Sequence, residues 1–341
     1  MRTPTSIPVR RRWLVAAAAA LALATACGAP APAPAAPPQG GAGTGFPVTI
    51  EHALGSTTIN AAPQRVVTVG WSDQDAVLAL GVQPVGTTEW FNAQPGAIFP
   101  WAKSAATGQT PEIVSNAGEI NFEKVAALKP DLILALYEGL DRSEYDKLSA
   151  IAPTVAHSAK YDPFGAPWQD MTLTTGKALG REQQAKDLVA GVEQKLAAVK
   201  TAHPQWHDKT LLVMASATSG TYQVFSPQDP KPRFFAALGF TTQPPWIGER
   251  VKENVATVSA EEVRLLDVDR LAWTSDPDTL KVLQADQLYN RLGVVSSGRV
   301  GYFDYTTAPF PGAAITFNTV LSIPYALDLV VPELERMDAA K

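Results

Sequence analysis

The sequence predicts an α/β protein in which two lobes are joined by one long helix. Three observations support this prediction. Short apolar strands alternate with short helices, a proline-free helical segment lies in mid-chain, and one sequence phrase is repeated on either side of that segment. Strand–helix alternation is typical of a parallel sheet covered by helices. The chain of 341 residues is also long enough for two domains.

The first folded elements are expected soon after residue 46. Residues 48–51 and 57–59 flank a Leu-Gly-Ser turn and predict a small hairpin. Residues 66–69 predict a β-branched strand, and Ser72 can cap the helix that follows. Residues 132–136 are continuously apolar, which is typical of a strand buried on both faces.

The long helix is expected between the two lobes. There is no proline between Trp168 and Pro204, and apolar residues recur at helical spacing over residues 181–200. A strand at residues 210–215 then restarts the α/β pattern. We therefore assign the chain as follows: N-terminal lobe 47–165, inter-lobe long helix 166–204 and C-terminal lobe 205–341.

The repeated phrase reads NFEKVAALKPDLILAL at residues 121–136 and SAEEVRLLDVDRLAWT at residues 259–274. Each copy begins with a capping residue, Asn121 or Ser259, and passes from a two-turn helix into a strand. Four positions are identical in the two copies: Glu123 and Glu261, Val125 and Val263, Leu128 and Leu266, Asp131 and Asp269. Their placement about one helix indicates two related lobes.

Residues 1–26 have the pattern of a secretory signal peptide. Four arginines precede an uncharged apolar run at residues 13–24, which is too short to span a bilayer. The single cysteine of the chain, Cys27, follows the small residues at the end of this leader. Residues 27–46 are mostly Pro, Ala and Gly, and this composition predicts an unfolded tether.

Cys27 has two possible interpretations. It is either an incidental small residue of a discarded leader or the acylated first residue of a lipoprotein. An exported chain with one thiol cannot form an internal disulfide, and a leader ending in cysteine resembles the bacterial lipobox, although Ala24 stands where Leu is usual. We favour lipidation at Cys27 and a location outside the cytoplasm on the cell membrane, by either the Sec or the twin-arginine route.

Charge and motifs narrow the classes of function. Residues 1–26 hold 4 of the 28 basic residues and none of the 33 acidic ones, so the rest of the chain has a net charge of −9. An acidic chain without basic runs is a poor candidate for nucleic-acid binding. The sequence also lacks the G-x-S-x-G and H-E-x-x-H motifs of two enzyme classes. We predict no catalytic residues and no direct metal ligands.

Several phrases of the chain resemble substrate-binding proteins of ABC importers for ferric siderophores, haem and cobalamin. The phrases are PQRVVTVGWSDQDAVLALGVQPVG, INFEKVAALKPDLILALYEGL, YDKLSAIAPTVA, FFAALGF, VSAEEVRLLDVDRLAW and SIPYALDLVVPEL. The most similar members are the lipid-anchored iron–siderophore proteins. The resemblance implies a class III periplasmic-binding-protein fold, with two Rossmann-like α/β lobes joined by a single long helix and a ligand held between them.

The resemblance also assigns partners. Glu123 and Glu261 match the glutamates, one per lobe, that dock onto arginines of the membrane permease, which works with an ATPase. Charged groups on separate lobes give a two-point register and steer the encounter. We expect a monomer without cofactors whose ligand is an iron(III) siderophore chelate, with haem or cobalamin as the alternative ligand. A secreted enzyme and a non-transport scaffold lipoprotein are the rival classes.

Ligand-binding residues are expected beyond the carboxyl ends of strands. Aromatic faces can cover a flat organic chelate, and guanidinium groups can pair with its anionic oxygens. An aromatic residue at such a place can equally belong to the core. The candidates are Trp71, Trp90, Tyr137, Tyr222, Arg233, Trp246, Arg250 and Trp273. Of these, Tyr222, Arg233, Trp246 and Arg250 lie in a proline-rich stretch that we expect to be loop.

Overall fold

The computed structural model describes residues 45–91, 94–116, 118–218 and 220–340. The predicted signal peptide of residues 1–26, the predicted lipidation site Cys27 and the predicted tether up to residue 44 lie outside the described residues. Within the described part of the chain, no helix has both the length and the apolar character needed to cross a membrane.

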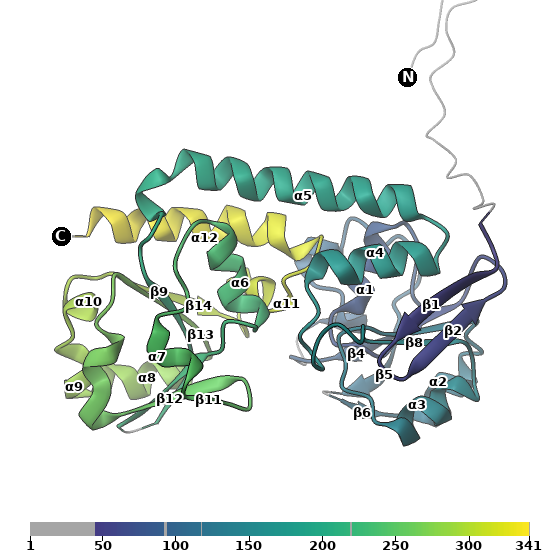
Figure 1. The fold of residues 1–341 in the computed structure, drawn as a ribbon, viewed down its shortest axis with the longest axis horizontal. Helices are drawn as coiled ribbons and strands as arrows, with labels where there is room; N and C mark the ends of the chain where they lie inside the picture. The colour runs from purple at the N-terminus through teal and green to yellow at the C-terminus, as the bar shows by residue number, and fades with distance from the viewer. Residues whose placement is uncertain (1–44, 92–93, 117, 219, 341) are drawn as a thin grey trace, which may run out of the picture. The chain divides into compact units, whose positions relative to one another are not determined.

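The N-terminal lobe is built on a six-stranded sheet with the strand order β6-β5-β4-β3-β7-β8 (Figure 1). All neighbouring strands are parallel except β5 and β6. The strands are β3 (Val66–Thr68), β4 (Gly86–Glu89), β5 (Glu112–Asn116), β6 (Glu119–Ile120), β7 (Leu132–Ala135) and β8 (Thr154–Ala156). The expected hairpin is present as the antiparallel pair β1 (Val48–His52) and β2 (Gly55–Ile59).

Short helices connect these strands. They are α1 (Asp73–Ala79), η1 (Pro95–Ala97), η2 (Pro100–Ala102), α2 (Phe122–Ala127) and α3 (Arg142–Ser149). Asn121 caps α2 as predicted, because its side chain accepts a hydrogen bond from the backbone N–H of Lys124 at 2.9 Å. Ser72 does not cap α1 with its side chain, although it occupies the N-cap position.

The C-terminal lobe has a mixed sheet with the strand order β11-β12-β10-β9-β13-β14. The strands are β9 (Leu211–Thr218), β10 (Thr221–Phe225), β11 (Val251–Lys252), β12 (Val255–Ser259), β13 (Arg270–Ser275) and β14 (Val300–Asp304). Strands β9, β13 and β14 are parallel, whereas β10, β12 and β11 join by antiparallel pairing. The expectation of a parallel sheet therefore holds for only half of this lobe.

The helices of the C-terminal lobe include two that return toward the N-terminal lobe, α11 (Pro311–Phe317) and α12 (Ser322–Ala339). The others are η3 (Pro204–Trp206), α6 (Pro230–Ala237), α7 (Pro245–Gly248), η4 (Ala260–Leu266), α8 (Pro277–Ala285), α9 (Gln287–Asn290) and α10 (Gly293–Ser296). The phrase that begins at Ser259 thus forms a 3₁₀ helix, and the Ser259 side chain makes no capping bond to it.

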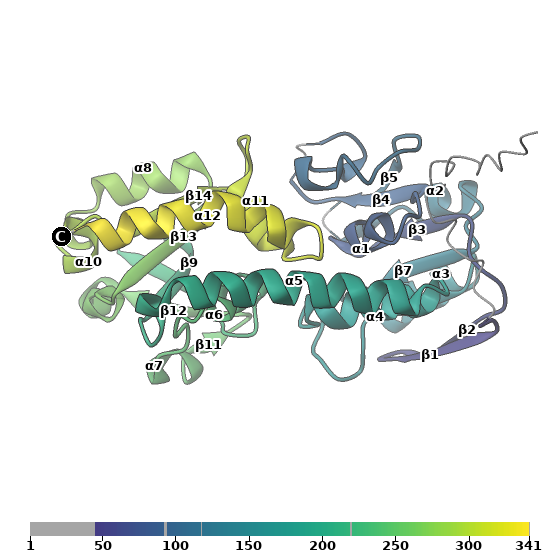
Figure 2. The same ribbon diagram turned by 90° about the horizontal axis from the view of Figure 1, so that it is seen from above.

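The segment between the lobes contains two helices, α4 (Trp168–Ala178) and α5 (Glu182–Ala202), where we assigned one. Gly180 separates them in the left-handed conformation, with φ of +66°. Helix α4 packs on α1 and β1, and the 21-residue α5 continues to α6 and α12 of the other lobe. Figures 1 and 2 both show α5 running along both lobes, so α5 is the connecting helix.

The two copies of the repeated phrase occupy equivalent places in the two sheets. Strand β7 lies between β3 and β8, and β13 lies between β9 and β14. The repeated aspartates have the same role: Asp131 accepts the backbone N–H of Arg65 at 2.8 Å, and Asp269 accepts that of Thr210 at 3.0 Å. Each carboxylate fixes the chain just before the neighbouring parallel strand, which explains why aspartate occurs in both copies.

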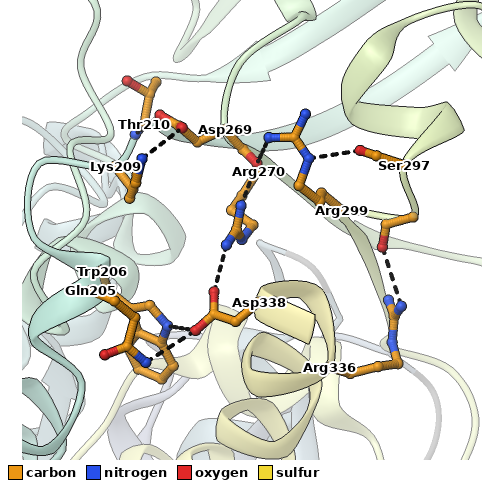
Figure 3. Close-up of polar contacts among 11 residues, drawn as sticks. Gln205, Trp206, Lys209, Thr210, Asp269, Arg270, Ser297, Arg299, Arg336 and Asp338 are labelled. Atoms are coloured by element: carbon orange, nitrogen blue, oxygen red, sulfur yellow. Dashed lines mark hydrogen bonds and ion pairs between the residues drawn. The ribbon is translucent and has the colours of Figure 1, made fainter. Parts of the chain in front are cut away.

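A polar cluster holds the end of α12 against the C-terminal sheet (Figure 3). Asp338 accepts hydrogen bonds from the Trp206 indole at 2.7 Å and from Gln205 at 3.1 Å, and pairs with the Arg270 guanidinium at 2.5 Å. Burial acts to raise the pKa of Asp338, but these donors outweigh it and keep the pKa below its ordinary value. The cluster joins the region after α5, strand β13 and α12.

One hydrophobic core extends across both lobes. Phe317 of α11 lies 5.2 Å from Trp101 and 5.0 Å from Phe99, measured between ring centroids. The Thr319 hydroxyl donates to Asp75 of α1 at 2.5 Å, and the Trp101 indole donates to the same carboxylate oxygen at 2.7 Å. Buried apolar contacts of this extent oppose large relative movement of two lobes.

Candidate ligand-binding cleft

A cleft of about 1140 Å³ is lined by residues of both lobes. It is larger than the roughly 300–1,000 Å³ of most small-molecule pockets, so it has room for a bulky ligand. Its N-terminal wall contains Trp71, Trp90, Tyr137, Asp162 and Phe164. Its C-terminal wall contains Phe225, Gln228, Asp229, Lys231, Glu253 and Asn254.

The N-terminal wall is aromatic because aromatic residues follow three neighbouring strands of the sheet. Trp71 follows β3, Trp90 follows β4 and Tyr137 follows β7, and these strands are adjacent and parallel. The centroid of the Trp71 ring lies 4.9 Å from that of Trp90 and 5.1 Å from that of Phe164. We expected ligand-binding residues beyond the carboxyl ends of strands, and these three strand ends line one surface of the cleft.

The buried carboxylate of Asp73 fixes this wall from behind. It accepts the backbone N–H groups of Leu136 at 2.6 Å and Tyr137 at 3.0 Å. The backbone N–H of Trp71 donates to the carbonyl of Tyr137 at 3.1 Å. A Cβ atom on Gly70 would lie 2.2 Å from the Asp73 carboxylate, so only glycine fits there. Asp73 therefore sets the positions of two cleft aromatics together.

A second buried acid lies next to the wall. Glu138 accepts the Trp71 indole N–H at 2.9 Å and the backbone N–H of Gly139 at 2.8 Å. Burial raises the pKa of Glu138 above its ordinary value, although both hydrogen bonds oppose the shift. The contact to the indole fixes the orientation of the Trp71 ring at the cleft surface.

The C-terminal wall contains a buried ion pair at the start of α6. Lys231 Nζ lies 3.0 Å from the Asp229 carboxylate and 3.9 Å from the centroid of the Phe225 ring. The other Asp229 oxygen accepts the side-chain amide of Asn254 at 2.7 Å. Asp229 also caps α6 by accepting the Lys231 backbone N–H. The charges of this pair are thus satisfied within the wall.

Arg233 lies beside the cleft. Its Nη1 donates to the carbonyl of Gly165 at 2.8 Å, which links α6 to the loop after β8. Arg233 lines two smaller hollows of about 250 and 370 Å³. Burial lowers the pKa of Arg233, and nearby Tyr137 and Asp229 oppose the shift. Arg233 is a link between the lobes at the edge of the cleft.

Two candidates belong to the core. Tyr222 and Trp273 have no exposed surface. Tyr222 lies in β10, where alternate residues face inward, and its hydroxyl donates to Asp286 at 2.5 Å. Trp273 lies inside β13, which is buried along its whole length, and its indole donates to Tyr289 at 2.8 Å. Our prediction that they contact ligand is therefore wrong, since neither reaches a surface that a ligand can touch.

Trp246 and Arg250 lie outside the described lining of the cleft, at helix α7. The Arg250 guanidinium pairs with Glu262 at 2.8 Å and lies 5.9 Å from the Trp246 ring. The proline-rich stretch that we expected to be loop contains β10, α6 and α7. Proline is tolerated at the first turn of a helix, and Pro230 and Pro245 both occupy that position.

The two repeated glutamates are exposed, as docking residues would need to be. Glu123 lies in the first turn of α2 and Glu261 in the first turn of η4. These helices precede the equivalent strands β7 and β13. Each lobe therefore presents one carboxylate at a matched place in its fold.

Sequence reasoning missed several residues of the cleft: Phe164, Phe225, Asp229, Lys231 and Asn254. Asp229 had a usable signal, because Asp-Pro is typical of a helix N-terminus. Phe225 and Asn254 could not be found from the sequence, because β10, β11 and β12 join the sheet through antiparallel pairing that the α/β pattern does not predict.

No group of three or more His, Cys, Asp or Glu side chains within the described ranges is arranged to hold a metal ion. His203 contacts the Val199 carbonyl at 2.8 Å and Glu335 at 2.9 Å through its two ring nitrogens. Its ring stacks on Trp206 with 3.9 Å between centroids. These contacts give His203 a role at the end of α5.

Comparison with known proteins places this geometry in a family. The sequence profile described as "Periplasmic binding protein" matches residues 66–305. The Fe(3+)-citrate-binding protein YfmC of Bacillus subtilis is 28% identical over 72% of this chain and 75% of its own length. The probable siderophore-binding lipoprotein YfiY of the same organism is 31% identical, and the match spans about half of each protein, 49%.

Solved structures agree with the fold. A periplasmic solute binding protein from Mycobacterium smegmatis has a TM-score of 0.76 and 34% identity over 85% of this chain and 98% of its own. The protein PiaA from Streptococcus pneumoniae, in complex with ferrichrome, has a TM-score of 0.73 and 29% identity over 86% of this chain and 99% of its own. The two-lobed α/β architecture is thus shared along nearly the whole length of these structures.

Replacement of Asp73 by asparagine tests the clamp behind the aromatic wall. Burial raises the pKa of Asp73 to about 7 from 3.8. Its protonated form therefore contributes stability that is complete below about pH 4 and lost as the pH rises through about 7. Asparagine keeps one acceptor and does not ionise. We expect Asp73→Asn to lower the free energy of unfolding at pH 5, and this deficit to shrink by about 2 kcal/mol at pH 8.

Thermal melts of the protein and the variant at both pH values measure this difference. Asp187→Asn, a replacement at an exposed position of α5, is the matched control. It should change the stability by the same small amount at pH 5 and at pH 8. A deficit for Asp73→Asn that does not change with pH would show that Asp73 is already ionised at pH 5.

Proposed function

Because the chain belongs to the periplasmic binding protein family, we propose that it captures a ferric siderophore outside the cytoplasm and delivers it to the permease of an ABC importer. The observation that carries this proposal is the cleft of about 1140 Å³ with aromatic residues at three adjacent strand ends. Ligands of open α/β sheets bind at this edge. The ligand arrives already chelated, so the protein supplies shape and aromatic surface.

The chemistry of the wall suits an organic chelate. Trp71, Trp90 and Phe164 offer ring faces and edges that bury apolar parts of a ligand. The names of similar proteins cite ferric citrate, ferric enterobactin and ferrichrome. These chelates differ in size and charge, so the relatives support the class of ligand. The choice of chelate depends on this cleft.

Delivery requires a partner on the membrane. The family works with a permease and an ATPase, and we propose that Glu123 and Glu261 contact that permease. Their matched positions in the two lobes support this role. The shared core and the contact between Thr319 and Asp75 favour small changes in the angle between the lobes during release. The protein would act as a monomer.

Haem or cobalamin is the alternative ligand, and the fluorescence titration described below distinguishes them from a ferric siderophore. If the protein were a secreted enzyme or a scaffold lipoprotein, no ferric chelate would bind to it. We further propose that Cys27 is the acylated anchor and that residues 28–46 let the folded lobes reach the permease.

Titration of tryptophan fluorescence tests ligand capture, because Trp71 and Trp90 lie in the cleft. We expect quenching by at least one ferric siderophore, and a loss of about tenfold or more in affinity for Trp71→Ala and Tyr137→Ala, as for central contact residues. Tyr302→Ala, at an exposed tyrosine of β14, is the control and should bind normally. If only haem or cobalamin binds saturably, that molecule and not a siderophore is the ligand of the cleft. Absence of quenching by all three classes would contradict the proposed function.

Charge reversal tests the docking pair. We expect Glu123→Lys with Glu261→Lys to abolish uptake of radiolabelled iron by cells while the affinity for the chelate changes less than about twofold, because both residues lie away from the cleft. The control is Asp187→Lys with Glu193→Lys, two exposed acids on α5, which should leave uptake intact. Normal uptake by the docking variant would refute the assignment.

Replacement of Cys27 by serine tests the anchor. Without the acyl chains, which bind membranes through their buried methylene groups, we expect the protein to move from the membrane fraction to the soluble fraction. Mass spectrometry of the unmodified protein should find a diacylated cysteine at its N-terminus. A mature chain that begins elsewhere without lipid would eliminate this role for Cys27.

A further inference from the structure

The charges of the cleft carry an inference about which ferric chelates it accepts. Among the described residues that line it, the charged ones are Asp162, Asp229, Lys231 and Glu253. Lys231 and Asp229 neutralise each other, with 3.0 Å between Nζ and the carboxylate, and both are buried. The remaining pair, Asp162 and Glu253, are both acidic.

These two acids come from opposite walls and face solvent at the rim. Asp162 belongs to the loop after β8, and Glu253 belongs to the turn between β11 and β12. Both are exposed, and neither forms an ion pair with another described residue. The charged side chains that line the cleft, three acidic and one basic, therefore have a net charge of −2.

Lys231 is the one basic side chain among the described residues that line the cleft. The Lys231 ammonium lies against Asp229 and over the Phe225 ring at 3.9 Å, so a ligand anion would have to displace both contacts. Arg233 donates to the Gly165 carbonyl, and with Lys160 it lines a separate hollow that also contains Asp162. Arg250 pairs with Glu262 outside the cleft.

On the basis of the proposed function, we propose that the cleft selects ferric chelates without net negative charge, such as ferric trihydroxamates, over anionic ferric catecholates and carboxylates. Three singly charged hydroxamates neutralise iron(III), whereas three doubly charged catecholates leave a trianion. The trianion would meet a cleft lining with a net charge of −2, and like charges brought together oppose binding. A neutral or cationic chelate keeps the contacts with the aromatic wall and avoids this repulsion.

The test compares three probes by fluorescence quenching at one low ionic strength: cationic ferrioxamine B, neutral ferrichrome and trianionic ferric enterobactin. We expect ferrioxamine B or ferrichrome to bind at least about tenfold more tightly than ferric enterobactin. Asp162→Asn with Glu253→Gln should raise the affinity for ferric enterobactin and lower that for ferrioxamine B, each by about threefold or more. Added salt should reduce both effects.

The matched control removes one aspartate and one glutamate elsewhere. Asp187→Asn with Glu193→Gln, both on α5, changes the net charge equally and should leave all three affinities within about 1.5-fold. Tightest binding of ferric enterobactin, or no response to loss of the rim acids, would overturn the charge selectivity and leave the proposed function intact. Lack of binding by every ferric chelate would instead refute the proposed function itself.

Discussion

The first turn of α1 is the point on which both the cleft and the contact between the lobes depend. Asp73 accepts the two backbone N–H groups at the end of β7 and so fixes Trp71 and Tyr137 relative to each other. Two residues further along, Asp75 accepts hydrogen bonds from Trp101 and from Thr319 of the C-terminal lobe. Burial raises the pKa of each carboxyl to about 7. Buried carboxyl groups of this kind are tolerated in a folded protein because hydrogen-bond donors surround them.

The same turn explains why the aromatic wall of the cleft is rigid. Its aromatic wall rests on a backbone held by the Asp73 carboxylate, so little side-chain freedom remains to be lost when a ligand binds. On the opposite wall, Asp229 and Lys231 neutralise each other. The charged groups that remain to face the ligand are the rim acids Asp162 and Glu253. The rigid aromatic wall thus belongs to the N-terminal lobe, whereas each lobe supplies one of the rim acids.

The connection between the lobes adds a limit on motion. Helix α5 runs along both lobes (Figure 2). Phe317 of α11 packs against Phe99 and Trp101 of the N-terminal lobe. Arg233 and Gly165 make a further link at the edge of the cleft. A ligand held between lobes joined at several places is released by a small adjustment more readily than by wide opening.

The sequence by itself determined the two-lobed α/β fold, the connecting helix, and the strand ends that carry Trp71, Trp90 and Tyr137. Those features follow from local periodicity and from the rule that parallel strands end at one edge. The matched positions of Glu123 and Glu261 also follow from the repeat. Only the tertiary structure decided that Tyr222 and Trp273 are core, and that Lys231 and Glu253 belong to the cleft. Burial and antiparallel pairing join residues far apart in the chain, and no local pattern records which face of a strand meets its neighbours.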